Sequence, residues 1–179
     1  MQSSLEHALL GLLQQQPRSG YDLRKVFAAT PMGTFSDSPG AIYPALHRLE
    51  RRGLIRGQIQ ERGGLRRRRL FRLTAMGLNT FRRLQGKPVT RDDLAHVEEL
   101  MLRFAFMDRS LGPAASVRFL KALAVELAAH IPTLCAHLAP DLPLSARLAL
   151  EHGISDYRAL LRWTRSAVLR YRPVAKGGR

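Results

Sequence analysis

The stretch that decides the fold is residues 38–55, which read SPGAIYPALHRLERRGLI. Ser38 followed by Pro39 is typical of a helix start, because serine accepts a bond from the first free amides and proline lacks only an amide that would be unpaired there. Gly53 ends the helical pattern, and Pro44 inside it is expected to loosen or bend the first turn. The expected core face is Ile42, Ala45, Leu46 and Leu49, and the expected solvent face is Gly40, Tyr43, His47, Arg48 and Arg51.

The residues on either side of this helix predict three more helices and a hairpin. Apolar spacing after Ser3 or Ser4 predicts a helix that stops before Pro17, and the capping-box pair of Ser19 and Asp22 predicts a second that stops before Pro31. Alternation over residues 55–59 and again near 71–73, around a Gly63-Gly64 turn, predicts a two-stranded hairpin, which we call the wing. Thr74 then caps a fourth helix. This order predicts a winged helix-turn-helix domain over residues 1–86.

The second half of the chain has a helical pattern throughout. Residues 86–89 break the preceding pattern and give the expected domain boundary. We expect a helical dimerisation domain over residues 87–172 and a disordered tail over 173–179, so the fold class is mainly α with an α+β head. The predicted helices run from Thr90 to about Met107, from Pro113 to near Pro132, and from Pro143 to about Tyr171.

The last predicted helix carries a seam of side chains at alternating spacings of four and three, which predicts packing against a partner helix. A helix of this length exceeds what the small domain needs to cover itself, so we expect a second copy of the chain to supply the partner. The seam consists of Leu150, Ile154, Tyr157, Leu161, Thr164, Val168 and Tyr171, and all of these except Thr164 and Tyr171 are assigned to the dimer interface.

The charge of the chain points to a polyanionic partner. Formal net charge is +15 and the pI is about 11.4. The first 86 residues hold 15 of the 29 basic residues but only 5 of the 14 acidic ones, and Lys25 is their only lysine. Arginine suits phosphates and guanine edges better than lysine does. The wing concentrates this charge in Arg62, Arg66, Arg67, Arg68 and Arg69.

Four blocks of sequence resemble the PadR family of bacterial transcriptional regulators. They are Ala8–Leu13, Ser19–Leu23, Ser38–Ile55 and Arg69–Gly77, although Phe71 stands where the family usually has tyrosine. The resemblance implies a homodimer that binds a palindromic operator, usually represses a nearby gene and is often released by a small effector. The residues that we expect to contact DNA are Tyr21, Ser38, Gly40, Tyr43, Pro44, His47, Arg48, Arg51, Arg66, Arg67 and Arg68.

Two other functions compete with this interpretation, a general nucleic-acid binder and an enzyme or metal sensor, and the regulator itself is expected to hold an effector site. A general nucleic-acid binder, including an RNA binder, would use the same arginines, although few aromatic residues lie among them. Glu126, His130 and His137 fall near one helical face and suggest a metal site, but Pro132 between them argues against it. A small hydrophobic or aromatic effector is expected near Phe104 and Trp163. No catalytic constellation is recognisable, so we expect neither catalysis nor a cofactor.

The remaining composition indicates a cytoplasmic protein. Cys135 is the only cysteine, which excludes an intramolecular disulfide and a multi-cysteine zinc site. The first residues lack the basic start of a targeting segment, and the apolar run of residues 8–13 is too short to span a bilayer. We therefore expect a cytoplasmic partner of double-stranded DNA with no membrane association.

Overall fold

The structure is a computed structural model that describes residues 3–35, 38–60 and 68–171. It divides into two compact units, Met1–Lys87 and Pro88–Arg179, which are described separately here. The predicted tail at 173–179 and the wing turn at Gly63-Gly64, with Arg62, Arg66 and Arg67, lie outside the described residues.

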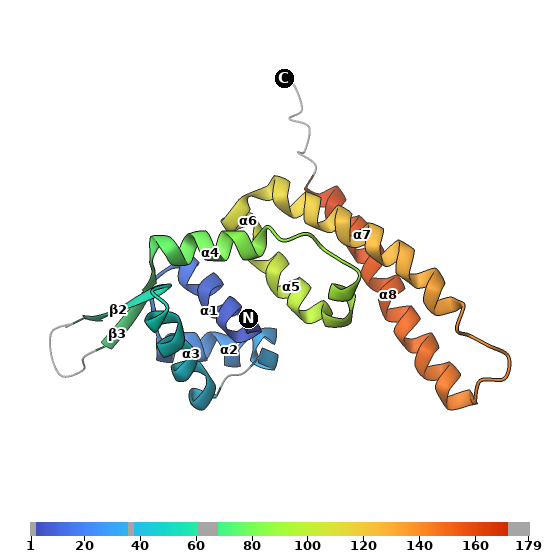
Figure 1. The fold of residues 1–179 in the computed structure, drawn as a ribbon, viewed down its shortest axis with the longest axis horizontal. Coiled ribbons are helices and arrows are strands. Elements are labelled where there is room, and N and C mark those ends of the chain that lie inside the picture. Colours follow the sequence, from blue (N-terminus) through green and yellow to red (C-terminus); the bar gives the residue numbers. More distant parts are fainter. Residues whose placement is uncertain (1–2, 36–37, 61–67, 172–179) are drawn as a thin grey trace, which may run out of the picture. The chain divides into compact units, whose positions relative to one another are not determined.

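The first unit contains helices and strands in the predicted order (Figure 1). Side chains at the expected positions cap four of the helices: Ser3, Ser19, Ser38 and Thr74 each accept a bond from a backbone amide of the first turn. The helix over 39–51 continues through Pro44. The elements are α1 (Ser4–Gln15), β1 (Arg18–Ser19), α2 (Gly20–Ala28), a 3₁₀ turn (Pro31–Phe35), α3 (Pro39–Arg51), β2 (Ile55–Gln60), β3 (Arg68–Leu73) and α4 (Ala75–Gln85).

The sheet has one strand more than the predicted hairpin. β2 and β3 pair antiparallel with Gly57 opposite Phe71, as the alternating pattern indicates. The two-residue strand β1 pairs with the other edge of β3, so the strand order is β1-β3-β2. A strand of two residues has no alternation to read, which is why the sequence did not predict it.

A single core holds these elements together. The four residues of the predicted buried face of α3 are all buried, which confirms the helical register of residues 38–55. Buried with them are side chains of α1, α2, β2 and α4, among them Leu9, Leu12, Leu23, Phe27, Ile55 and Phe81, and α3 contacts α1, α2 and β2. The register fixes which side chains α3 presents to solvent.

The second unit is helical, with two departures from the predicted boundaries. Thr90 and Asp93 form a capping contact at the predicted helix start, but a 3₁₀ turn follows and the α-helix begins only at Val97. A short helix that the sequence did not predict follows Phe106. α7 passes Pro132 and ends three residues later, because proline close to the last turn removes few helical bonds. The elements are a 3₁₀ turn (Asp92–His96), α5 (Val97–Ala105), α6 (Met107–Leu111), α7 (Pro113–Cys135) and α8 (Leu144–Arg170).

The seam of α8 is used within the chain. Ile154 and Thr164 are buried, and Tyr157, Leu161 and Val168 pack against a core whose members on α7 include Phe119, Leu120, Leu123 and Leu127. The Tyr157 hydroxyl also donates to the Leu94 carbonyl oxygen at 3.0 Å. The partner helix that the spacing indicates is therefore α7 of the same chain, and α7 and α8 run alongside each other (Figure 1). Among the described residues, no helix is long and apolar enough to cross a membrane.

Candidate nucleic-acid interface

The solvent face of α3 divides into a centre and two flanks. On an ideal helix, Gly40, His47 and Arg51 point within about 40° of one another, directly away from the core. All three are exposed, and neither His47 nor Arg51 has a polar partner within the described parts of the chain. Ser38 accepts a bond from the Gly40 amide at 3.1 Å and caps the start of this face. The centre therefore presents two side chains able to meet a ligand without losing an internal bond.

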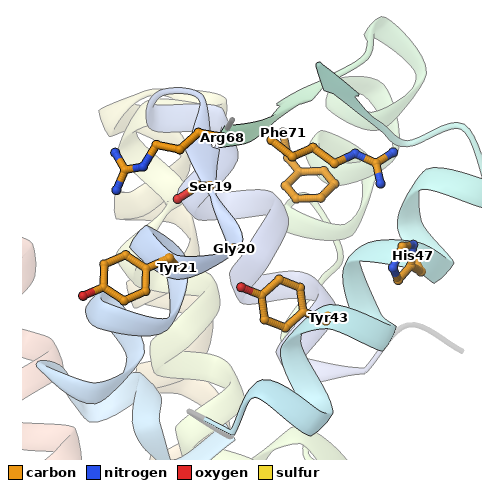
Figure 2. A pocket seen from close by; sticks show the side chains of 8 residues that line it. Ser19, Gly20, Tyr21, Tyr43, His47, Arg68 and Phe71 are labelled. Carbon is orange, nitrogen blue, oxygen red and sulfur yellow. The ribbon is translucent and has the colours of Figure 1, made fainter. Parts of the chain in front are cut away.

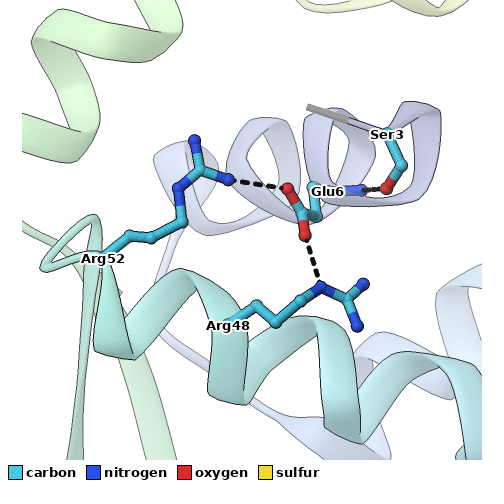
Figure 3. A network of polar contacts seen from close by, with 4 residues as sticks. All are labelled: Ser3, Glu6, Arg48 and Arg52. Atoms are coloured by element: carbon cyan, nitrogen blue, oxygen red, sulfur yellow. Dashed lines mark hydrogen bonds and ion pairs between the residues drawn. The ribbon is translucent and has the colours of Figure 1, made fainter. Parts of the chain in front are cut away.

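One flank of α3 is tied to α1 by a buried carboxylate. Arg48 and Arg52 lie about 60 and 100° from Arg51 around the ideal helix. The Arg48 Nε donates to Glu6 Oε1 at 2.9 Å, and an Arg52 Nη donates to Glu6 Oε2 at 3.0 Å. Figure 3 shows Glu6 reaching from α1 to both guanidinium groups. The Glu6 side chain is only 5% exposed, whereas those of Arg48 and Arg52 are 45% and 46% exposed.

A second carboxylate ties the opposite flank of α3 to the wing strands. Glu50 accepts two bonds from an Arg69 Nη, at 2.8 and 2.9 Å, and one from the Gly57 backbone amide at 2.8 Å. The Arg69 guanidinium also lies 5.4 Å from the centre of the Phe71 ring. These contacts join the C-terminal half of α3 to both β2 and β3, so α3 and the base of the wing are held as one surface.

Tyr21 and Tyr43 project from α2 and α3 into a pocket of about 610 Å³ (Figure 2). Tyr43 lies against Gly20: a Cβ at that position would be 2.6 Å from Tyr43 Cε1, so only glycine accommodates the ring where it is. The Lys25 ammonium lies 4.8 Å from the centre of the Tyr21 ring. The pocket is lined by Ser19, Gly20, Tyr21, Tyr43, His47, Arg68, Arg69 and Phe71.

The floor of this pocket includes the start of α2. The Ser19 hydroxyl donates to Asp22 Oδ2 at 2.7 Å, and the Ser19 amide donates to the same oxygen at 3.3 Å. The Ser19 hydroxyl lowers the pKa of Asp22 below its ordinary value, and the Arg68 guanidinium 3.6 Å away acts in the same direction. Asp22 is therefore a carboxylate that holds both the helix start and an arginine of β3.

The structure brings most of the described candidate residues into two neighbouring hollows that share His47. Tyr21, Tyr43 and Arg68 line the pocket of Figure 2, while Pro44, Arg48 and Arg51 line a shallower hollow with Glu50. The sequence interpretation missed the carboxylates. Glu6 stands next to Leu5 in the first turn of α1, and an acid beside the apolar residues of that helix was the available signal.

The candidate residues of the second unit form two further groups. Phe104 and Trp163 meet edge to face with ring centres 5.7 Å apart, and they line a pocket of about 320 Å³ with Ser166, Ala167, Arg170 and Tyr171. His130 contacts an Arg91 nitrogen through Nδ1 at 3.1 Å. Within the described ranges, no three His, Cys, Asp or Glu side chains are grouped as metal ligands would be, so Glu126, His130 and His137 do not form such a group.

Comparisons with known proteins give a family for the first unit. Residues 9–83 match the model of the transcriptional regulator PadR-like family. Curated proteins give no significant match. Similar solved structures include Bacillus subtilis PadR in complex with operator DNA, with 21% identity over 93% of this chain and 98% of that one and a TM-score of 0.42. The PadR-like regulator BC1756 of Bacillus cereus is 23% identical over 93% and 94% of the two chains, with a TM-score of 0.40. Residues 9–83, less than half of the chain, are therefore similar to the transcriptional regulator PadR-like family.

Proposed function

We propose that this chain is a DNA-binding transcriptional regulator, a repressor of a nearby gene, that contacts duplex DNA through α3 and the wing strands. The observation that carries the proposal is the solvent face of α3, where unpartnered His47 and Arg51 lie between flanks held by Glu6 and Glu50. A helix of this kind enters the major groove with its exposed face against the bases, and flanking arginines meet phosphates.

In this proposal the residues have different tasks. Tyr43 and His47 face the base edges, and Arg51, at the C-terminal end of the same face, contacts a phosphate. Tyr21 and Arg68 contact the sugar-phosphate backbone at the pocket of Figure 2. Ser38 and Gly40 place the amides of the α3 start against a phosphate, because a helix N-terminus favours negative charge. Arg66 and Arg67 extend the phosphate contact along the wing. These assignments are supported by the exposure of the α3 side chains and by the positive charge of the arginines.

We also propose that the regulator is a homodimer on a palindromic operator. The seam of α8 is occupied by α7, so the surface for a second copy is the other side of these helices. That side carries exposed apolar side chains: Val125 of α7 is 66% exposed, and Leu144, Leu148 and Leu169 of α8 are 71%, 54% and 54% exposed. On an ideal helix the three leucines point within about 60° of one another, and their mean direction is about 135° around the helix from that of the seam. In such a dimer the two α3 helices, one from each copy, would meet DNA about 34 Å apart.

The test of the proposal compares an intact palindrome with its half. Duplex selected from a random-sequence pool by the full chain should contain two inverted half-sites, and one dimer should bind it. A duplex with a single half-site should bind at least tenfold more weakly, because only one of the two DNA-binding domains of the dimer can then contact its half-site. Equal affinities would contradict the dimeric regulator. Competition by bulk RNA at equal nucleotide concentration would instead favour a general nucleic-acid binder.

The pocket at Phe104 and Trp163 is the site that we propose for a small hydrophobic or aromatic effector. An effector can change DNA affinity only if it binds two arrangements of the dimer unequally. Trp163 is the only tryptophan, so its fluorescence reports binding directly. A broad panel of aromatic compounds should include ligands that change this fluorescence and weaken DNA binding. If no compound of the panel changes the fluorescence, the proposal is contradicted.

A further inference from the structure

Glu6 is the most buried carboxylate within the described part of the first unit, and its position is not explained by helix formation alone. It sits in the first turn of α1 among buried apolar neighbours, where an uncompensated charge would cost several kcal/mol. Both of its oxygens are instead engaged by arginines of the proposed DNA-binding helix, one oxygen to each arginine (Figure 3). The carboxylate thus occupies the donors in the way a phosphate would.

Each guanidinium keeps donors that Glu6 does not use. A guanidinium carries five N–H groups, and the contacts to Glu6 engage Nε of Arg48 and one Nη of Arg52. A phosphate that arrives from solvent at a defined position can therefore bind the remaining donors while the contact to Glu6 persists. A phosphate at any other position has to draw the arginine away from Glu6 first.

We propose that Glu6 is a specificity-determining residue that competes with DNA phosphates for Arg48 and Arg52 and so suppresses binding to arbitrary duplex. The inference rests on the proposed function, since it assumes that α3 binds DNA. A duplex with the correct sequence is held in register by contacts to the centre of α3, which brings phosphates to the free donors. An arbitrary duplex lacks those contacts and meets two arginines that are both bound to Glu6, which neutralises one of their two positive charges.

The direct test measures affinity for a random-sequence duplex as a function of salt, with wild type and Glu6→Gln. The variant frees at least one arginine in each copy of the chain for phosphate. The slope of log affinity against log salt should therefore be steeper than that of the wild type by about one. Affinity for random duplex at 50 mM salt should rise roughly three- to tenfold, and the ratio of selected-duplex to random-duplex affinity should fall. A purely structural role for Glu6 would lower both affinities and leave the slope unchanged, which would overturn the proposal.

Two controls assign the effect to the arginines. Glu98→Gln makes the same change of net charge in the second unit, at an exposed residue, and should not alter the slope. Adding Arg48→Gln and Arg52→Gln to Glu6→Gln should abolish the gain in affinity for random duplex. A gain that persists in this triple variant would contradict competition for the two arginines.

A matched pair of surface variants keeps the proposal testable if Glu6→Gln fails to fold. Arg48 and Arg51 are both exposed on α3, but only Arg48 is bound to Glu6. Arg51→Gln should reduce the salt slope on random duplex by about one, and Arg48→Gln should reduce it by clearly less. Equal reductions would overturn the proposal. If the wild type selects no common sequence from the pool, sequence-specific regulation itself fails, whereas these random-duplex slopes remain interpretable.

Discussion

Gly20 shows how a single residue can determine where the Tyr43 side chain lies on the surface of the first unit. Its backbone lies against the Tyr43 ring at a distance that no other side chain allows. The sequence shows Gly20 only as the first residue of a capped helix, where alanine would be equally acceptable. The need for glycine depends on a ring that is 23 positions away in the chain, so the local pattern could not indicate it.

We predict that Gly20→Ala leaves the fold stable and weakens DNA binding. Alanine is the better helix former, but its methyl group would displace the Tyr43 ring from the pocket, and we expect affinity for the selected duplex to fall by about three- to tenfold, in the range of one lost contact. Fluorescence anisotropy and thermal unfolding measure the two effects. In a Tyr43→Ala background the same substitution should cost nothing further, and a full additional loss would contradict this account.

Gly77 is required for packing. A Cβ at this position would collide with the backbone carbonyl of Leu54, which cannot move as a side-chain end can. We predict that Gly77→Ala lowers the free energy of unfolding by about 1–3 kcal/mol, the usual cost of overpacking. Gly153→Ala is the matched control, because that helical glycine has open space around it and alanine should stabilise by up to about 1 kcal/mol. Urea unfolding of the two variants should therefore move in opposite directions, and equal shifts would refute the steric explanation.

At the scale of the element, the sequence predicted correctly those helix ends that depend only on residues close in the chain. The caps at Ser3, Ser19, Ser38 and Thr74 are correct because each is satisfied by its own helix. The strand β1 depends on its pairing with β3, which is distant in the chain. The α8 seam has the correct face, but its spacing does not state whether the partner is α7 or another copy. Glu6 was missed for the same reason, since its partners lie more than 40 residues away.

We predict that the capping box of α2 makes stability depend on pH. Bonds from Ser19 lower the pKa of Asp22 in the folded chain below its unfolded value of 3.8. The contribution is therefore complete at pH values above 3.8 and is lost as pH falls through the lower folded pKa. Asp22→Asn should lower the unfolding free energy at pH 7 by about 1 kcal/mol and change it little below the folded pKa.

The matched control for this prediction is Asp141→Asn. Asp141 is exposed and has no polar partner within the described residues. Its substitution should leave the difference in unfolding free energy between pH 7 and pH 3 unchanged. If Asp22→Asn also leaves that difference unchanged, the capping box does not couple the fold to pH.

At the scale of the whole molecule, the proposed dimer gives two faces of α8 different roles: one packs against α7, and the other contacts the second copy of the chain. We predict that Ile154→Ala, on the seam, destabilises the chain by about 2–5 kcal/mol because it opens a cavity at a buried position of α8. Leu148→Asp, on the exposed face, should leave the fold intact and shift the chain from dimer to monomer. Sedimentation equilibrium with thermal unfolding measures both, and a Leu148→Asp variant that remains dimeric would place the interface elsewhere.

The central claim is that the arginines of this chain bind the phosphates of duplex DNA, and its most direct measurement is the salt dependence of affinity. With six phosphates neutralised, log affinity for the selected duplex should fall with log salt at a slope of roughly −5. The slope should become shallower by about one when Arg51 is replaced by glutamine. A slope near zero for the wild-type chain would contradict the account.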